Sequence, residues 1–76
     1  MKTVEEILSK VLSIDSKTIS DSTQPEDIES WDSFNGLILV TELEKNFRVK
    51  FSLEEVVAVK NVGDIKKVLR RHGVKI

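Results

Sequence analysis

The sequence contains no cysteine and a single histidine, His72. Without cysteine the chain has no disulfide, no thiol nucleophile and no thiolate ligand for a metal ion. A serine nucleophile needs a base within reach. His72 falls on the apolar side of the last predicted helix, where a packing role near the helix C-terminus is favourable. The sequence therefore predicts neither an enzyme nor a metal site.

Long hydrophobic runs and an excess of one charge are also missing. No apolar stretch approaches the ~20 residues that a membrane-spanning helix needs, and Glu5 and Glu6 interrupt the N-terminal apolar pattern in a way that does not fit a signal peptide. We therefore expect a cytoplasmic protein without a membrane span. The chain has 12 basic and 13 acidic residues, whereas a nucleic-acid-binding domain usually carries a basic excess. No nucleic-acid partner is expected, although the basic tail from Lys60 to Ile76 leaves a small DNA-binding domain as a rival interpretation.

The chain is instead rich in helical periodicity. Apolar residues at i, i+3, i+4 and i+7 predict a helix over about Val4–Leu12, with Thr3 in the position of a helix cap. A second helix is expected from Asp32 or Ser33 to about Phe47. Three isolated isoleucines indicate that the long polar loop between the two helices is attached to the core: Ile14, Ile19 and Ile28.

Two further helices follow. Ser52 and Glu55 have the spacing of a capping box, which predicts a short third helix. Asn61 is a favourable cap for a last helix over about Val62–His72. Gly73 stands where a left-handed residue commonly ends a helix.

These elements predict an all-α fold. We expect a small helical bundle of three main helices and a short third helix, with a long loop between the first and second helices. Residues 1–76 are expected to form one domain and to act as a monomer.

Ser33 stands between Asp32 and Phe34, where a polar loop becomes an apolar run. The local pattern favours Ser33 as a helix cap, as it does Ser52, because a serine oxygen at a helix start accepts a hydrogen bond from a free backbone N–H group. The alternative is that the Ser33 hydroxyl is modified. A helix N-terminus favours a phosphate group through its free N–H groups and its dipole.

The second helix has apolar residues on two sides. At about 100° per residue, the expected core face holds Gly36, Val40, Leu43 and Phe47, flanked by Leu37 and Leu39. The opposite side holds Phe34, Ile38, Thr41 and Lys45. Large apolar residues on that side are either the scattered exposure that is normal for proteins or a contact face for partner proteins beside Ser33.

Beyond these patterns, the chain resembles the acyl carrier proteins, a phosphopantetheine-attachment family that also includes peptidyl and D-alanyl carriers. The resemblance covers nearly the whole chain. It rests on the helix–long loop–helix order, on "WDSF" and "LVTELEKNF" at the two ends of the second helix, and on the later "VKFSLEEV" and "NVGDIKKVL". The attachment motif of the family is Asp-Ser-Leu, which reads Asp32-Ser33-Phe34 in this chain.

The resemblance implies that Ser33, flanked by Asp32 and Phe34, carries a 4′-phosphopantetheine taken from coenzyme A by a phosphopantetheinyl transferase. The protein would hold an acyl group as a thioester on this arm and present it to an acyl-activating ligase, acyltransferase or synthase, with no catalysis of its own. In carriers that sequester their cargo, the acyl chain lies between the second and third helices. The residues expected to line this space, unless they are plain core, are Leu39, Leu43, Val57, Val59 and Ile65.

The chain departs from the carriers of primary fatty acid synthesis, which are strongly acidic along the exposed side of the second helix. Its partner face there would hold Phe34, Ile38, Thr41, Glu42 and Lys45. Because charge complementarity influences partner choice, we expect a role in a specialised lipid, polyketide or related pathway. Two alternatives stay open: a peptidyl or aminoacyl carrier, for example a D-alanyl carrier, and an unmodified interaction module that binds through Phe34 and Ile38.

Overall fold

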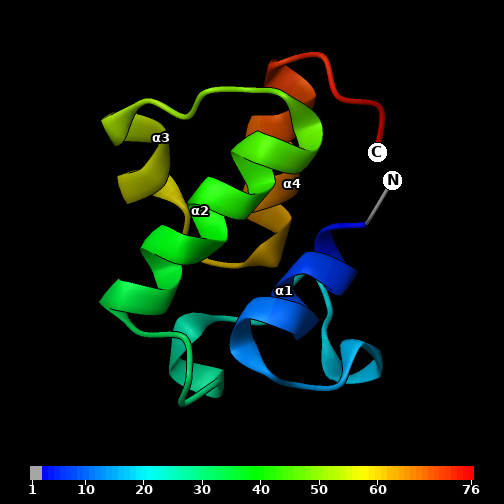
Figure 1. Ribbon diagram of the computed structural model, residues 1–76, viewed down its shortest axis with the longest axis vertical. Coiled ribbons are helices and arrows are strands. Elements are labelled where there is room, and N and C mark those ends of the chain that lie inside the picture. The colour runs from blue at the N-terminus through cyan, green and yellow to red at the C-terminus, as the bar shows by residue number, and fades with distance from the viewer. Residues whose placement is uncertain (1–2) are drawn as a thin grey trace.

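Helices make up all the regular structure of residues 3–76, which are the residues that the computed structural model describes (Figure 1). The α-helices are α1 (Val4–Leu12), α2 (Ser33–Phe47), α3 (Leu53–Ala58) and α4 (Val62–Arg71). Two short 3₁₀ turns, η1 (Ser16–Thr18) and η2 (Pro25–Asp27), lie in the long loop between α1 and α2. The predicted all-α bundle, with three main helices and a short third one, is confirmed. No helix in this part of the chain has the length and apolar character needed to cross a membrane.

Side-chain caps fix where the helices begin. Thr3, Ser52 and Asn61 cap α1, α3 and α4 as expected, and each accepts a hydrogen bond from the backbone N–H group three residues further on. The expectation that Ser33 caps α2 is wrong. The cap is Asp32, whose carboxylate accepts from the third residue of α2, and Ser33 is the first helical residue. Aspartate and serine are comparable N-caps, and because α2 begins at Ser33, the residue in the capping position is Asp32.

Left-handed residues occur at the C-terminal ends of α1, α2 and α4. Gly73 has a φ of 88°, as its place after the last helix predicts, although α4 itself ends at Arg71 and His72 is its cap. The ends of α1 and α2 are formed by the left-handed residues Ser13 (φ 57°) and Arg48 (φ 56°), which are not glycines.

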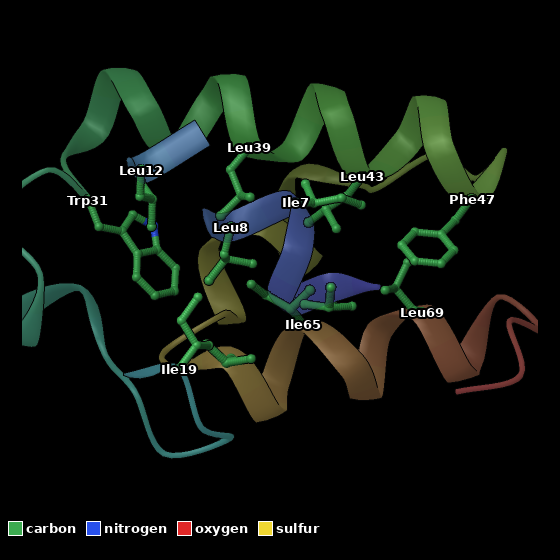
Figure 2. Close-up of a cluster of buried hydrophobic side chains, with 12 residues drawn as sticks. Ile7, Leu8, Leu12, Ile19, Trp31, Leu39, Leu43, Phe47, Ile65 and Leu69 are labelled. Atoms are coloured by element: carbon green, nitrogen blue, oxygen red, sulfur yellow. The ribbon is translucent and has the colours of Figure 1, made fainter. Parts of the chain in front are cut away.

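The hydrophobic core lies between α2 and α4, where side chains from these two helices meet those of α1 (Figure 2). The buried members are Val4, Ile7, Leu8 and Leu12 from α1, Leu39, Leu43 and Phe47 from α2, Val62, Ile65 and Leu69 from α4, and Ile19 and Trp31 from the loop. As expected, the loop isoleucines contact this core, with Ile14 and Ile28 packed against its edge.

The buried face of α2 is rotated from the expected one. It is centred between Leu39 and Leu43, whereas Val40 is half-buried and Leu37 is 64% exposed. The physical reason is that α1 covers the Leu39 side of α2, while Leu37 and Val40 face a cavity instead of packed side chains.

Polar contacts hold the long loop against the start of α4. The Lys66 ammonium donates hydrogen bonds to the carboxylates of Glu5 in α1 (2.7 Å) and of Asp21 in the loop (2.6 Å). The backbone N–H of Gly63 donates to the Asp21 carbonyl at 2.8 Å. A Cβ atom at Gly63 would lie only 3.1 Å from that carbonyl oxygen, so glycine allows this close approach. The loop is thereby tied to both α1 and α4.

Candidate functional site

Ser33 lies at the first position of α2 with its hydroxyl unused. Because Asp32 caps the helix through the N–H of Asn35 (2.8 Å), the Ser33 side chain is not needed as a cap. It is exposed and makes no hydrogen bond within residues 3–76. The backbone N–H groups of Ser33 and Phe34 are likewise unpaired in this part of the chain. An anionic group on the hydroxyl would therefore find two free N–H donors at the positive end of a helix.

A chain of hydrogen bonds holds this helix start in place. The Asn35 side-chain Nδ2 donates to the Ser30 carbonyl at 2.7 Å. The Ser30 hydroxyl donates to the carbonyl of Leu12 at the end of α1, also at 2.7 Å. These contacts link α1, the loop and the first turn of α2, so Ser33 stands on a fixed support. Neither Ser30 nor Asn35 was singled out from the sequence, because their partners are 18 and 5 residues away.

An apolar cavity of about 520 Å³ opens beside Ser33. Asp32 and Ser33, which are both exposed, line the part of it that we call the mouth, and Leu43 lies further along α2. The remaining lining residues come from the loop, α2, the segments around α3, and α4: Pro25, Trp31, Gly36, Leu37, Leu39, Val40, Phe51, Val56, Val59 and Ile65. The residue with the exposed hydroxyl, Ser33, is thus also one of the residues that line the apolar cavity.

Four of the five residues expected to line a cargo space do line this cavity: Leu39, Leu43, Val59 and Ile65. Val57 does not line it. Its side chain is 65% exposed, and the neighbouring Val56 lines the cavity instead. The six-residue α3 carries adjacent apolar residues at 56 and 57, and its rotation is set by contacts outside the helix.

His72 provides one of these contacts. Its imidazole stacks on Phe51, with ring centroids 6.2 Å apart and an interplanar angle of 2°. Its Nε2 atom lies 3.0 Å from the Glu55 carboxylate in α3. The Ser52 backbone N–H, and then the His72 ring, hold the pKa of the Glu55 carboxyl below its ordinary value. His72 therefore supports the cavity wall, as its expected packing role implies, and its hydrogen-bond partner is Glu55 rather than Ser33.

The expected partner face lies on the outer side of α2. Phe34 is 71% exposed, Ile38 is partly exposed, and Thr41 and Lys45 are exposed. Glu42, the fifth residue expected on this face, is half-buried and therefore less exposed than the other four. Three exposed apolar residues that were not assigned to this face enlarge the apolar surface of α2 and α3: Leu37, Leu53 and Val57.

Within residues 3–76 no group of three or more histidine, cysteine, aspartate or glutamate residues is placed to bind a metal ion. The site around Ser33 offers a free hydroxyl, unpaired backbone donors and an apolar cavity. A small helical bundle with this combination has the architecture of a prosthetic-group carrier.

A comparison with known protein families agrees with the architecture of a prosthetic-group carrier. The family model described as the phosphopantetheine attachment site matches residues 2–69, and the chain belongs to this family. The match confirms the resemblance to the acyl carrier proteins. The prosthetic group of the family is a covalently attached 4′-phosphopantetheine. A comparison with curated proteins gives no match. Carriers of this family generally do not catalyse reactions themselves; they interact with phosphopantetheinyl transferases and biosynthetic enzymes.

Proposed function

We propose that Ser33 is the attachment residue and that the protein carries an acyl group on the arm attached there. A phosphopantetheinyl transferase would direct the Ser33 oxygen to the phosphorus that bears the pantetheine in coenzyme A. The bond to the bridging oxygen of the pyrophosphate breaks, 3′,5′-ADP leaves, and a base on the transferase takes the hydroxyl proton. The exposed, unbonded hydroxyl and the free N–H groups of Ser33 and Phe34 support this assignment.

The observation that best supports an acyl cargo is the cavity beside Ser33. Its walls beyond the mouth are formed mainly by aliphatic side chains, among them Leu37, Val40 and Ile65. Burial of an alkyl chain there would be favourable by about 0.8 kcal/mol per methylene group. A charged amino acid such as D-alanine would gain nothing comparable and would lose hydration. The acyl interpretation is therefore favoured over the aminoacyl one.

The outer face of α2 supports a dedicated pathway. It presents Phe34 and Ile38 rather than a row of carboxylates, and its last turn carries Lys45. A partner that fits this face needs an apolar contact surface and little basic charge. We propose that the cargo is loaded or accepted by a ligase, acyltransferase or synthase of a specialised lipid, polyketide or related pathway, and that the carrier catalyses no step itself.

Intact mass spectrometry tests the attachment. The chain is incubated with coenzyme A, Mg²⁺ and a broad-specificity transferase, alongside Ser33→Ala and Ser52→Ala. We expect wild type and Ser52→Ala to gain one phosphopantetheine and Ser33→Ala to gain none. Ser52 is the matched control because it also begins a helix before an apolar residue, but its oxygen is used as a cap. A folded wild-type chain that gains no mass would instead support an unmodified interaction module.

A further inference from the structure

Trp31 has a hydrogen-bond donor that the fold does not use. Its side chain belongs to the core, with only 9% of the residue exposed, yet its indole Nε1 has no partner within residues 3–76. Buried indole N–H groups usually have a partner. No side-chain nitrogen or oxygen in the described part of the chain is both sealed from solvent and unpaired. The Trp31 nitrogen must therefore open onto accessible space.

That space is the mouth of the cavity. Trp31 lines the cavity together with Gly36 and Ser33. Nε1 is the atom nearest to the side chain that Gly36 lacks, 3.8 Å from the position of a Cβ atom. Gly36 follows Ser33 by three residues, which is close to one helical turn. The absent side chain leaves space beside the Nε1 atom, within the part of the cavity that Trp31, Ser33 and Gly36 line.

The donor stands out because the cavity walls are otherwise apolar. Beyond Asp32 and Ser33 at the mouth, the other lining side chains have no polar atoms: Pro25, Leu37, Leu39, Val40, Leu43, Phe51, Val56, Val59 and Ile65. An indole N–H donates one hydrogen bond and accepts none. It can therefore pair only with an acceptor. In a largely apolar ligand such as an acyl group on its arm, the common acceptor is a carbonyl oxygen.

We infer that the Trp31 indole N–H donates a hydrogen bond to a carbonyl oxygen of the acylated arm that extends from Ser33 into the cavity. This inference rests on the proposed function and adds a specificity residue to it. Trp31 would recognise an acceptor oxygen near the mouth, and the aliphatic walls would hold the hydrocarbon beyond. The oxygen comes either from an amide of the arm or from the acyl thioester. Cargo without such an oxygen near the mouth would lose this contact.

Trp31 is the only tryptophan, so its indole N–H gives a single resonance in ¹⁵N-labelled protein. Four forms are compared, each with its mass verified: unmodified, phosphopantetheinylated, octanoyl thioester, and an octyl thioether that has the chain without the thioester carbonyl. Where the bond forms, the indole proton moves downfield and its exchange with solvent slows by about fivefold, the factor expected for a typical net hydrogen bond.

The outcomes separate the two oxygen sources. A change already present in the phosphopantetheinylated form identifies an arm amide, and a change that appears only in the thioester identifies the acyl carbonyl. An indole proton that is unmoved in every form, or that first moves in thioester and thioether equally, overturns the inference. Failure of the proposed function would be recognised separately from failure of this inference, because the protein would then gain no mass at Ser33. In Trp31→Phe, which keeps an apolar ring without the donor, hydroxylamine should cleave the octanoyl thioester about fivefold faster if the thioester is the source.

Discussion

The Asp32 carboxylate accepts a hydrogen bond from the backbone N–H of Asn35 at 2.8 Å. This bond decides the role of the next residue, because a helix start needs one capping side chain there and Asp32 provides it. Ser33 then projects an exposed hydroxyl from the first turn of α2. The loop behind it is fixed through Ser30, which bonds to the end of α1.

Replacement of the cap should weaken the fold without removing the hydroxyl. We expect Asp32→Ala to lower the free energy of unfolding by about 1 kcal/mol, and Asp32→Asn, which keeps a capping oxygen, to lower it by much less. Urea unfolding followed by helical circular dichroism measures both. Ser33→Ala is the matched control, since the Ser33 side chain makes no hydrogen bond in residues 3–76. An equal loss in Ser33→Ala and Asp32→Ala would contradict this division of roles.

The ion pairs of Lys66 should make the attachment of the loop sensitive to acid. Lys66 lowers the pKa of Glu5 from its ordinary 4.5 and that of Asp21 from its ordinary 3.8, in both cases chiefly by donating a hydrogen bond to the carboxylate. The same bonds, to Asp21 first and then to Glu5, raise the pKa of Lys66. A carboxyl group whose pKa is lower in the folded state stabilises the fold above its ordinary pKa. That stabilisation is lost as pH falls through the lowered value.

We therefore expect Lys66→Met to lower the free energy of unfolding at pH 7, by about 1 kcal/mol or less through the partly buried Glu5 pair. The Asp21 carboxylate is largely exposed, so solvent screens its pair with Lys66. The substitution should also flatten the decline of stability below the ordinary Glu5 value of 4.5. Urea unfolding at a series of pH values measures both effects. Lys67→Met is the control. The Lys67 side chain is largely exposed, and its Nζ atom is 3.9 Å from Oδ1 of Asp64, which is too far for a strong ion pair. If Lys66→Met and wild type lose stability in parallel on acidification, the ion pairs do not hold the loop.

Two adjacent valines of α3 test the cavity. Val56 lines it, and Val57 is 65% exposed. In the octanoyl form we expect Val56→Thr to speed thioester cleavage by hydroxylamine about fivefold, because a hydroxyl in an apolar wall costs about 1 kcal/mol or more. Val57→Thr should leave the cleavage rate unchanged. Equal effects of the two substitutions would show that the cargo does not use this cavity.

The outer face of α2 gives a test of partner recognition. Ile38→Glu places a charge about one helical turn from the exposed Phe34, and a partner that binds this apolar face would have to desolvate that charge. We expect a drop of about tenfold or more in kcat/KM for the loading enzyme, which corresponds to about 1.4 kcal/mol. Ser22→Glu adds the same charge at an exposed position in the loop between α1 and α2 and should have little effect. A similar loss in both variants would point to net charge rather than to this face.

The sequence predicts the helices well because their signals are local. Caps such as Thr3, Ser52 and Asn61 act on N–H groups three residues away, and the α4 stripe appears directly in the spacing of its apolar residues. The competition between Asp32 and Ser33 for one N–H group is also local, but both residue types are good caps. The choice between them therefore could not be read from the pattern.

The walls of the cavity depend on contacts that no periodicity reveals. Whether Val56 or Val57 faces inward depends on how α3 is held by Glu55 and His72, which are 17 residues apart. The place of Trp31 depends on the space left by Gly36 and on the packing of the loop against α1. Such long-range contacts also explain why Ser30 and Asn35 were not recognised as supports of the site.

Fragmentation mass spectrometry of the loaded chain locates the prosthetic group, which we propose is attached to Ser33. Trypsin cleavage after Lys17 and Lys45 releases residues 18–45, a peptide that contains Ser33, the nearby Ser30 and other hydroxyl residues. We expect N-terminal fragments that end at Asp32 to lack the phosphopantetheine and those that extend through Ser33 to carry it. Phosphopantetheine on Ser30, or on any residue other than Ser33, would rule out Ser33 as the attachment residue.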